Sequence, residues 1–401
     1  MSRARFLATL AVQVPWTAAQ LLVEALLLAS VARRPARAGE RPWAERYERI
    51  GPGWLTGILR DGGALDGGEV VAVELERFGT VGQMSAVFRL RPTYGPGAAG
   101  PERLVLKTTA PEMKQRVLNA ALGVFAEELR CYRLPRPERG LLRPHCWYAA
   151  QHRLTRAAIL VIDDLSAWRG APADGQLAVE DATRVVLALA EHHATWWQDP
   201  GLRARGFKTT SKMVCDTFGP MCALAWPRAR KLMTPLVDAD TLALLGGYVT
   251  HHEAIGRRIM AGPVTLVHGD LNPNNLFLDD AGGAVYAIDW QAAHIGHWAE
   301  DLAYLAVMSM DAEVWAAHED AMIAAHRGVL VDRGIAVDEA RHRADYALGL
   351  FQVGAILILA ALILDPRKNP PLYEQYRERI RGWAIAARRH RLPALLAEVQ
   401  R

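Results

Sequence analysis

Apolar and polar residues alternate in two different ways along the chain. From Val70 onward apolar residues fall on every second position, with Val71, Val73 and Leu75 on one face, as expected of a β-strand. Farther along, apolar residues recur at helical intervals, as in the run over residues 179–197. The pattern therefore predicts a segment rich in strands, followed by a segment that is mostly helical.

Polar residues gather at the ends of three short apolar runs in the second half of the chain. An apolar strand ends at Val267, a polar loop leads into a second strand, and a turn at 281–283 precedes a third strand that ends at Asp289. This pattern delivers Asp270, Asn275 and Asp289 to the mouths of adjacent strands. A hard divalent cation takes oxygen ligands, and phosphoryl transfer depends on positioning and charge neutralisation, so these residue types suit Mg²⁺ and a phosphoryl group.

The spacing H-G-D-x-x-x-x-N, followed by I-D-W, resembles the catalytic and metal-binding loops of the aminoglycoside phosphotransferase and choline kinase group, relatives of the protein kinases. The resemblance implies that Asp270 orients or deprotonates an acceptor hydroxyl. It also implies that Asn275 and Asp289 hold Mg²⁺ against the phosphates of ATP. Asp and Asn also cap ordinary turns, but the ordered set that includes His268 and Trp290 favours the catalytic interpretation.

A lysine interrupts an apolar strand in the first half of the chain. Lys107 follows Leu-Val-Leu, and a lysine partly removed from water needs an anionic partner. The helical stretch over 117–134 offers Glu127 and Glu128, which point about 100° apart on a helix. Glu128, followed by Leu-Arg-Cys-Tyr, resembles the family's partner for the phosphate-gripping lysine. The alternative is that Lys107 lies at a strand edge and extends into solvent.

Two further segments resemble nucleotide-binding elements of the family. A glycine-containing turn with Gly79, Gly82 and Ser85 joins two strands and resembles the loop that covers the phosphates, although an ordinary hairpin also uses such glycines. The buried strand ending near Ile162 resembles the hinge, where backbone groups of 162–165 would bind adenine. Asp164 is included in this prediction, although acidic residues there could also simply solvate a strand end.

Two residues outside the loops are expected to support them. Asp301 lies in a D-L-A-Y-L element that resembles the one following the family's metal loop, and at a helix start it would accept backbone N–H bonds and brace the catalytic loop. His193 ends a long helix in a pattern similar to the family's L-H-A-x-x-W. We expect His193 to pack or to form hydrogen bonds rather than to catalyse.

Composition excludes few classes of function. The 401 residues are 51% apolar and carry a net charge of +4, so the total charge indicates no strong field for nucleic acid. The cysteines lack paired or metal-like spacing and fit buried apolar positions in a reducing, cytoplasmic compartment. They are Cys131, Cys146, Cys215 and Cys222. Scattered histidines without a third ligand make zinc a poor prediction.

Apolar residues dominate 6–32, but Glu24 within them would cost about 2.5–3.5 kcal/mol at a bilayer centre. We expect a helix over 1–34 that lies on a membrane surface or packs on the protein itself, although the segment also mimics a signal peptide. The apolar run over 349–364 fits a buried helix better than a membrane span. The expected divisions are the helix at 1–34, a linker at 35–53, a nucleotide-binding lobe at 54–163 and a catalytic and substrate lobe at 164–401.

The resemblance as a whole implies a two-lobed, protein kinase-like α+β fold, with a small antiparallel sheet in one lobe and helices in the other. It implies an ATP- and Mg²⁺-dependent phosphotransferase acting on a hydroxyl group of a small molecule, closest to the ecdysteroid kinase-like branch. Apolar and polarizable residues within 199–262, among them Met213 and Met221, suit a lipophilic acceptor, although core packing explains them equally well. Two alternatives are an antibiotic phosphotransferase, for aminoglycosides or macrolides, and a catalytically silent scaffold that binds nucleotide or lipid.

Overall fold

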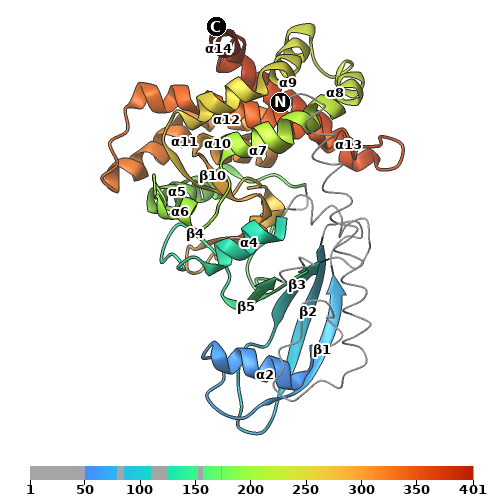
Figure 1. Ribbon diagram of the computed structural model, residues 1–401, viewed down its shortest axis with the longest axis vertical. Coiled ribbons are helices and arrows are strands. Elements are labelled where there is room, and N and C mark those ends of the chain that lie inside the picture. The colour runs from blue at the N-terminus through green and yellow to red at the C-terminus, as the bar shows by residue number, and fades with distance from the viewer. Residues whose placement is uncertain (1–49, 79–84, 110–123, 152–156, 173, 401) are drawn as a thin grey trace. The chain divides into compact units, whose positions relative to one another are not determined.

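The computed structural model describes residues 50–78, 85–109, 124–151, 157–172 and 174–400 (Figure 1). They form two compact units. The sheet unit contains the described residues within 50–136 and 143–167, and the helical unit contains those within 137–142 and 168–400. The predicted helix over 1–34, most of the predicted linker, and Gly79 and Gly82 lie outside the described residues.

A five-stranded antiparallel sheet forms the sheet unit, with strand order β1-β2-β3-β6-β5. The strands form because β-branched and aromatic residues are frequent in them. Their bounds are Val70–Phe78 for β1, Ser85–Tyr94 for β2, Leu104–Thr109 for β3, Cys146–Gln151 for β5 and Ala158–Asp163 for β6.

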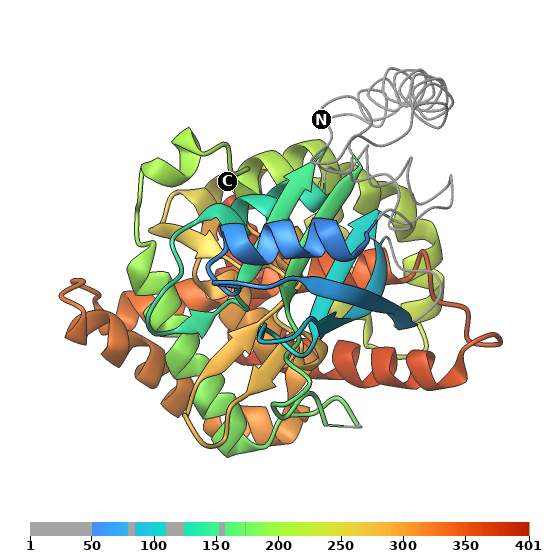
Figure 2. The ribbon, with the colours of Figure 1, turned by 90° about the horizontal axis from the view of Figure 1, so that it is seen from below.

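Helices α2 (Pro52–Asp61) and α4 (Val124–Arg133) lie against opposite faces of this sheet. Leu55 of α2 shares a buried core with Leu104 and Leu106 of β3, because alternate residues of a strand face the same side. Lys107, the next residue, points the other way and contacts α4. The alternation of β3 therefore separates an apolar core from a charged pair, and Figure 2 shows α2 lying across the sheet.

Helices make up most of the helical unit. Their apolar faces pack on one another because each carries apolar residues at helical spacing. They are α5 (Val179–Thr195), α6 (Gly201–Ala204), α7 (Thr210–Met213), the π-helix η2 (Val214–Phe218), α8 (Gly219–Met233), α9 (Ala239–Met260), α10 (Ala299–Ser309), α11 (Ala312–Asp332), α12 (Glu339–Ala360), α13 (Pro370–Arg389) and α14 (Leu392–Val399).

Two small sheets carry the predicted loops. One pairs β7 (Val264–Val267) with β10 (His294–His297), and the other has the order β4-β9-β8. The latter consists of β4 (Leu141–Leu142), β9 (Val285–Ala287) and β8 (Leu276–Leu278), with the 3₁₀-helices η3 (Pro273–Asn275) and η4 (Trp290–Ala292) beside it. The three strands expected around the loops are confirmed.

The run over 349–364 falls mainly within α12, the one helix of the described residues that is long and apolar enough to cross a membrane. Since 72% of its most apolar window is buried inside the protein, the prediction of a buried helix is confirmed. The α+β division into a unit with an antiparallel sheet and a mostly helical unit is also confirmed.

Candidate active site

The loop after β7 is held in place by Asp301, at the start of α10. The Asp301 carboxylate accepts hydrogen bonds from the backbone N–H groups of His268 and Gly269, each 2.7 Å long. Gly269 has φ +79°, and a Cβ atom there would lie 2.5 Å from the carbonyl oxygen of Ala292, so the turn requires glycine. The prediction that Asp301 braces the catalytic loop is confirmed.

His268 connects this loop to the strand end that carries Asp289. Its Nε2 lies 2.9 Å from the carbonyl oxygen of Ile288, and its Nδ1 accepts the N–H of Asp270 at 3.3 Å. Because a carbonyl only accepts and Nδ1 already accepts the Asp270 N–H, the ring proton is on Nε2. The imidazole therefore joins the backbone of the residue before Asp289 to the backbone of Asp270.

The carboxylate of Asp270 is surrounded by hydrogen-bond donors. The Tyr304 hydroxyl, from α10, donates to Oδ1 at 2.6 Å, and the Asn272 amide donates to the same oxygen at 2.9 Å. The Asn275 amide donates to Oδ2 at 3.1 Å and to the backbone oxygen of Asp270 at 2.8 Å. These contacts fix the direction in which the carboxylate points.

Asp289 lies close enough to Asp270 for its charge to affect the pKa of Asp270. Burial raises the pKa of Asp270, and the nearby charge of Asp289 raises it further, while the Tyr304 hydrogen bond acts in the opposite direction. Asp289 has φ +61° and ψ +57°, the left-handed conformation that Asp tolerates better than most residues. A strained aspartate beside a second carboxylate is a feature of functional sites.

Asn275 turns its side chain toward the same group. Its Nδ2 is engaged by Asp270, which leaves the side-chain carbonyl oxygen as the atom suited to a cation. Its backbone oxygen accepts the N–H of Ile288 at 2.9 Å, which anchors the end of η3 to the segment before Asp289. The structure thus places three of the predicted residues, Asp270, Asn275 and Asp289, around one short stretch of backbone.

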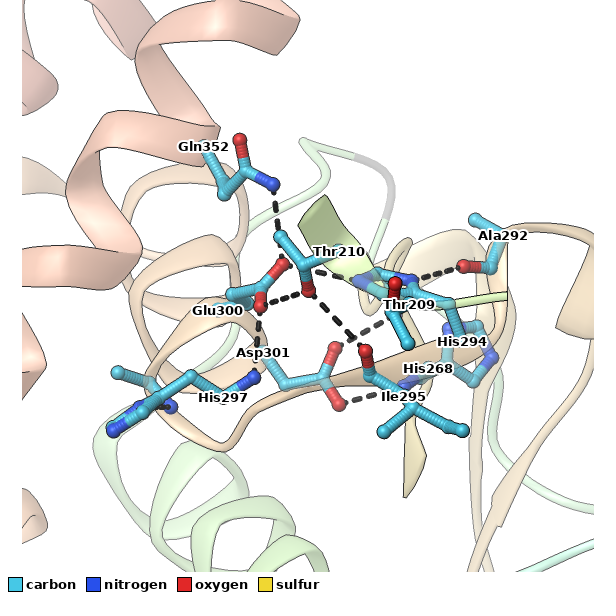
Figure 3. A network of polar contacts seen from close by, with 12 residues as sticks. Thr209, Thr210, His268, Ala292, His294, Ile295, His297, Glu300, Asp301 and Gln352 are labelled. Atoms are coloured by element: carbon cyan, nitrogen blue, oxygen red, sulfur yellow. Dashed lines mark hydrogen bonds and ion pairs between the residues drawn. The ribbon is translucent and has the colours of Figure 1, made fainter. Parts of the chain in front are cut away.

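A buried polar network lies behind the loop (Figure 3). Glu300 accepts hydrogen bonds from the Thr210 hydroxyl at 2.7 Å and from the His297 N–H at 2.8 Å, and it lies 3.1 Å from Nε2 of His294. Nδ1 of His294 lies 2.8 Å from the Ala292 oxygen, so both ring nitrogens face acceptors. Burial alone would lower the pKa of His294, but the Glu300 carboxylate raises it. This favours a buried imidazolium–carboxylate pair beside the loop after β7.

The sheet unit carries the lysine and its partner. Nζ of Lys107 lies 2.9 Å from Oε1 of Glu128, and the two side chains are 10% and 1% exposed. Glu127 instead lies 2.7 Å from Arg130 on the same helix. The structure therefore pairs Lys107 with Glu128, as the resemblance implies, and Lys107 does not extend into solvent as the alternative required.

The end of β6 differs from the simplest expectation. Asp164 lies 2.6 Å from Nε of Arg89, and Asp163 accepts the indole N–H of Trp147 at 2.7 Å, so these carboxylates brace neighbouring segments rather than only solvating a strand end. Ile162 is buried in the sheet and pairs with residues of both neighbouring strands. Ser85 begins β2 opposite Thr109 of β3. Adenine and phosphate binding by these residues stays a prediction.

A cavity of about 330 Å³ opens beside the catalytic loop within the helical unit. Its wall includes Asn272, whose amide contacts the Asp270 carboxylate. Its only charged lining residue among those described is Arg379 of α13. Its larger apolar lining residues come from α10, α12, the segment after α12 and the start of α13, namely Met308, Ile356, Leu357, Ile363, Leu364 and Leu372.

Sequence reasoning did not find this wall or Tyr304. No residue of the expected acceptor region, 199–262, lines the cavity, and Met233 within it is fully buried whereas Met213 and Met221 are half-buried. Tyr304 follows Asp301 by three positions, so the two share a helix face. That spacing was the available signal for a second α10 residue at the loop.

The four cysteines are free thiols, of which Cys131 and Cys222 are buried and the other two are half-buried. His193 is fully buried and hydrogen-bonded, with Nε2 at 3.3 Å from Asp301. The prediction that His193 packs and forms hydrogen bonds is therefore confirmed.

Comparison with known proteins connects this geometry to a family. A family model described as the phosphotransferase enzyme family matches residues 120–337, more than half of the chain. No curated protein matches the sequence. Among solved structures, the GDP complex of aminoglycoside 2'-phosphotransferase-IIIa has 16% identity and a TM-score of 0.45, and the match covers 83% of this chain and 98% of that one.

Two other solved structures are similar over comparable lengths. A microcompartment-associated aminopropanol kinase has 15% identity and a TM-score of 0.48, with 79% of this chain and 92% of that one covered. A choline/ethanolamine kinase family protein from Mesorhizobium loti has 15% identity and a TM-score of 0.45, with 81% and 92% covered. The match over residues 120–337 includes Glu128 and the whole loop from His268 to Asp301, and the chain belongs to the phosphotransferase enzyme family.

Proposed function

We propose that this chain transfers the γ-phosphoryl group of ATP, with Mg²⁺, to a hydroxyl group of a small lipophilic molecule. One observation carries the proposal: the Asp270 carboxylate is joined, through the Asn272 amide, to the wall of a mostly apolar cavity. A hydroxyl presented from that cavity would meet a carboxylate able to orient it or to accept its proton.

Asn275 and Asp289 are the residues that would hold Mg²⁺. Their donor atoms are an amide oxygen and a carboxylate, the ligands that Mg²⁺ takes, and the amide nitrogen of Asn275 is already turned away toward Asp270. No cluster of three or more His, Cys, Asp or Glu side chains within the described ranges is arranged for a metal, which agrees with an ion that takes its other ligands from nucleotide phosphates and water. When bound, the ion would neutralise phosphate charge.

In the sheet unit, Lys107 held by Glu128 would pair with the nucleotide phosphates. The turn that contains Gly79, Gly82 and Ser85 would cover them, and backbone groups of Ile162 and Asp164 would bind adenine. These roles rest on the family resemblance of the segments and on the buried Lys107–Glu128 pair.

The charge and polarity of the cavity favour a lipophilic acceptor. Arg379 donates to the carbonyl oxygens of Gly175 at 3.0 Å and of Met310 at 3.2 Å, so its cation is fixed at the wall. A polycationic aminoglycoside would be repelled by this guanidinium and would gain little from the apolar side chains around it. An acceptor with an apolar body and a neutral or acidic group fits the lining better.

The proposal is tested by a screen for ATP consumption with hydroxylated sterols, hydroxylated fatty acids, macrolides and aminoglycosides as acceptors. With the acceptor that is found, Asp270→Asn should lower turnover by about 10²- to 10⁴-fold while ATP still binds. Asp216→Asn is the matched control, because Asp216 is an exposed aspartate of η2 far along the chain from the loop. Full activity of Asp270→Asn would contradict the assigned role.

A second measurement separates an enzyme from a silent scaffold. ATP with Mg²⁺ should raise the melting temperature, and Asp289→Ala should abolish the part of the shift that depends on the metal. Stabilisation by ATP that is independent of Mg²⁺ in the unchanged protein would favour the scaffold.

Two finer assignments belong to the same proposal. The residues Ile288-Asp289-Trp290-Gln291 and Glu128-Leu-Arg-Cys-Tyr favour the ecdysteroid kinase-like branch. A cytoplasmic location, where ATP is supplied and thiols stay reduced, accompanies peripheral membrane contact through residues 1–34. Deleting residues 1–34 should then move the protein out of the membrane fraction, and unchanged partitioning would contradict the contact.

A further inference from the structure

Three buried histidines form a continuous chain that ends at the brace of the catalytic loop. The histidine chain consists of His193 (α5), His326 (α11) and His342 (α12), which are 0%, 0% and 1% exposed. Nε2 of His193 lies 3.3 Å from Oδ2 of Asp301, and its Nδ1 lies 2.9 Å from Nε2 of His326. Nδ1 of His326 in turn lies 3.2 Å from Nε2 of His342.

The Asp301 carboxylate on one side of His193 and the His326 ring on the other together fix the direction of donation along the three rings. Burial alone would raise the pKa of Asp301, but the hydrogen bond and charge of His193 and the loop N–H groups lower it to about 2, so Asp301 is a carboxylate that only accepts. His193 donates to it from Nε2, and Nδ1 of His193 accepts the hydrogen bond from His326. Burial lowers the pKa values of His193 and His326, so both rings are neutral near pH 7. Each ring therefore donates from Nε2, and Nδ1 of His193 and Nδ1 of His326 each accept from the next ring.

The rings are held by stacking as well as by hydrogen bonds. His342 stacks on Trp298 with ring centroids 3.8 Å apart and an interplanar angle of 7°, and His326 stacks on the same indole at 4.8 Å. Trp298 directly precedes α10, the helix that carries Asp301 and Tyr304. On the other side, the Thr265 hydroxyl of β7 donates to the backbone oxygen of His193 at 2.9 Å. The histidine chain is thus attached to β7, which precedes the catalytic loop, and to α10, which carries Asp301.

Apart from Asp301, charged side chains near the histidine chain pair with one another rather than with its three rings. Nε2 of His297 lies 3.5 Å from Asp345, and Nε of Arg341 lies 2.7 Å from the other oxygen of that carboxylate. A proton added to any ring would place a cation among buried side chains, and in His193 or His326 it would also reverse a hydrogen bond. Neutral rings permit only one direction of donation toward the Asp301 carboxylate.

We propose that His326 and His342 are positioning residues for the reaction: by fixing the Nε2–H tautomer of His193, they hold the Asp301 carboxylate against the loop that carries Asp270. The proposal rests on the proposed phosphotransferase function for its kinetic consequence only. Its structural consequence, a single tautomer of His193, is measured without any phosphoryl acceptor.

The test compares His326→Phe, which keeps an aromatic ring on Trp298 but neither donates nor accepts, with His326→Gln, whose amide nitrogen can replace Nε2–H. Nitrogen-15 NMR of histidine-labelled protein should show the Nε2–H tautomer at His193 in the wild type and His326→Gln. In His326→Phe, Nδ1 of His193 loses its donor, so a mixture with the Nδ1–H form should appear. His318→Phe, on the same helix but exposed, is the control and should match the wild type.

The kinetic part uses the acceptor found by the screen. His326→Phe should lower kcat by about 10-fold or more, as loss of a group that orients an active-site residue does, and should change KM for ATP by less than about twofold. His326→Gln should recover most of kcat. If His326→Phe does not fold, His342→Phe is measured in the same way and should show a smaller effect of the same kind.

Two outcomes would overturn the proposal. One is a His193 ring that keeps its Nε2–H tautomer in the folded Phe variants. The other is a kcat that stays at the wild-type value in them. If no acceptor is ever phosphorylated but the wild-type tautomers are as described, the proposed function fails while the arrangement of the histidine chain stands, so the two failures are distinguishable.

Discussion

Removing the Tyr304 hydroxyl should make Asp270 a weaker acid. The hydroxyl lies 2.6 Å from Oδ1, the shortest of the side-chain contacts to that carboxylate, and Tyr304 is 8% exposed. Burial raises the pKa of the phenol well above its usual range, so Tyr304 remains a donor throughout the working pH range. Tyr304→Phe keeps the ring and deletes only this hydrogen bond.

The magnitude follows from the energy of a hydrogen bond to a charged group. Such a bond contributes about 1.5–3 kcal/mol, and one pKa unit corresponds to about 1.36 kcal/mol. The bond stabilises the carboxylate and so lowers the pKa of Asp270. Deleting it should therefore raise that pKa by about 1–2 units. The acidic limb of the pH profile of kcat/KM should move upward by the same amount.

Two assays check this shift. Carbon-13 NMR of the Asp270 carboxyl group follows its titration directly, and the pH profile of phosphorylation follows its effect on catalysis. Tyr248→Phe is the matched control, because it deletes another buried hydroxyl, 3.3 Å from Gln352 and without contact to Asp270. A folded Tyr304→Phe protein whose Asp270 titrates as in the wild type would refute the reasoning.

Three further predictions concern stability. Glu128→Gln removes the carboxylate next to buried Lys107 and should lower the free energy of unfolding, measured in urea titrations, by about 3–5 kcal/mol. The control Glu127→Gln should lower it less, because its partner Arg130 is 31% exposed. Equal losses would contradict the assigned pairing. The control Gly283→Ala should lower the free energy of unfolding by about 1–2 kcal/mol, because Gly283 has a positive φ. Gly269→Ala should lower it by more, because Gly269 also has a positive φ and its new Cβ would lie 2.5 Å from a backbone atom. Equal effects would exclude that contact. Burial lowers the pKa values of the three chain histidines in the folded protein, so the free energy of unfolding is highest above their unfolded-state pKa near 6.5 and falls as the pH falls below it. For His342, whose pKa is lowered to about 3, the loss between pH 6.5 and 5.5 should be about 1 kcal/mol, and His342→Phe should reduce the acid loss by that amount relative to the wild type. Identical pH slopes would mean that His342 takes up no proton on unfolding.

The elements around the catalytic loop could be predicted because their information is local. A few residues at fixed spacing specify the strand ends, the glycine turn and the Asp270–Asn275 loop. The Lys107–Glu128 pair needed one further step, because helix geometry lets only one of two adjacent glutamates face Lys107 and the family resemblance selected Glu128. Asp301 likewise follows from its place at the start of a helix close in sequence to the loop.

The cavity and the histidine chain could not be predicted in this way. Helical periodicity indicates which face of α12 is buried, but it does not indicate which helix covers that face. His193, His326 and His342 come from three helices, and only packing brings their rings together. The apolar residues of α12 allowed a buried helix to be predicted. They did not indicate that this helix lines a cavity beside Asn272, because that depends on how the chain folds after α10.

The cavity wall also affects when a newly made chain can work. The loop with Asp270 is synthesised before α12 and α13, which supply Leu357 and Arg379 to the cavity. A ribosome-bound chain that has reached only α10 therefore has its candidate catalytic carboxylate but lacks the surface that would receive an acceptor. A product truncated before α13 should therefore be inert toward its acceptor even where its loop folds.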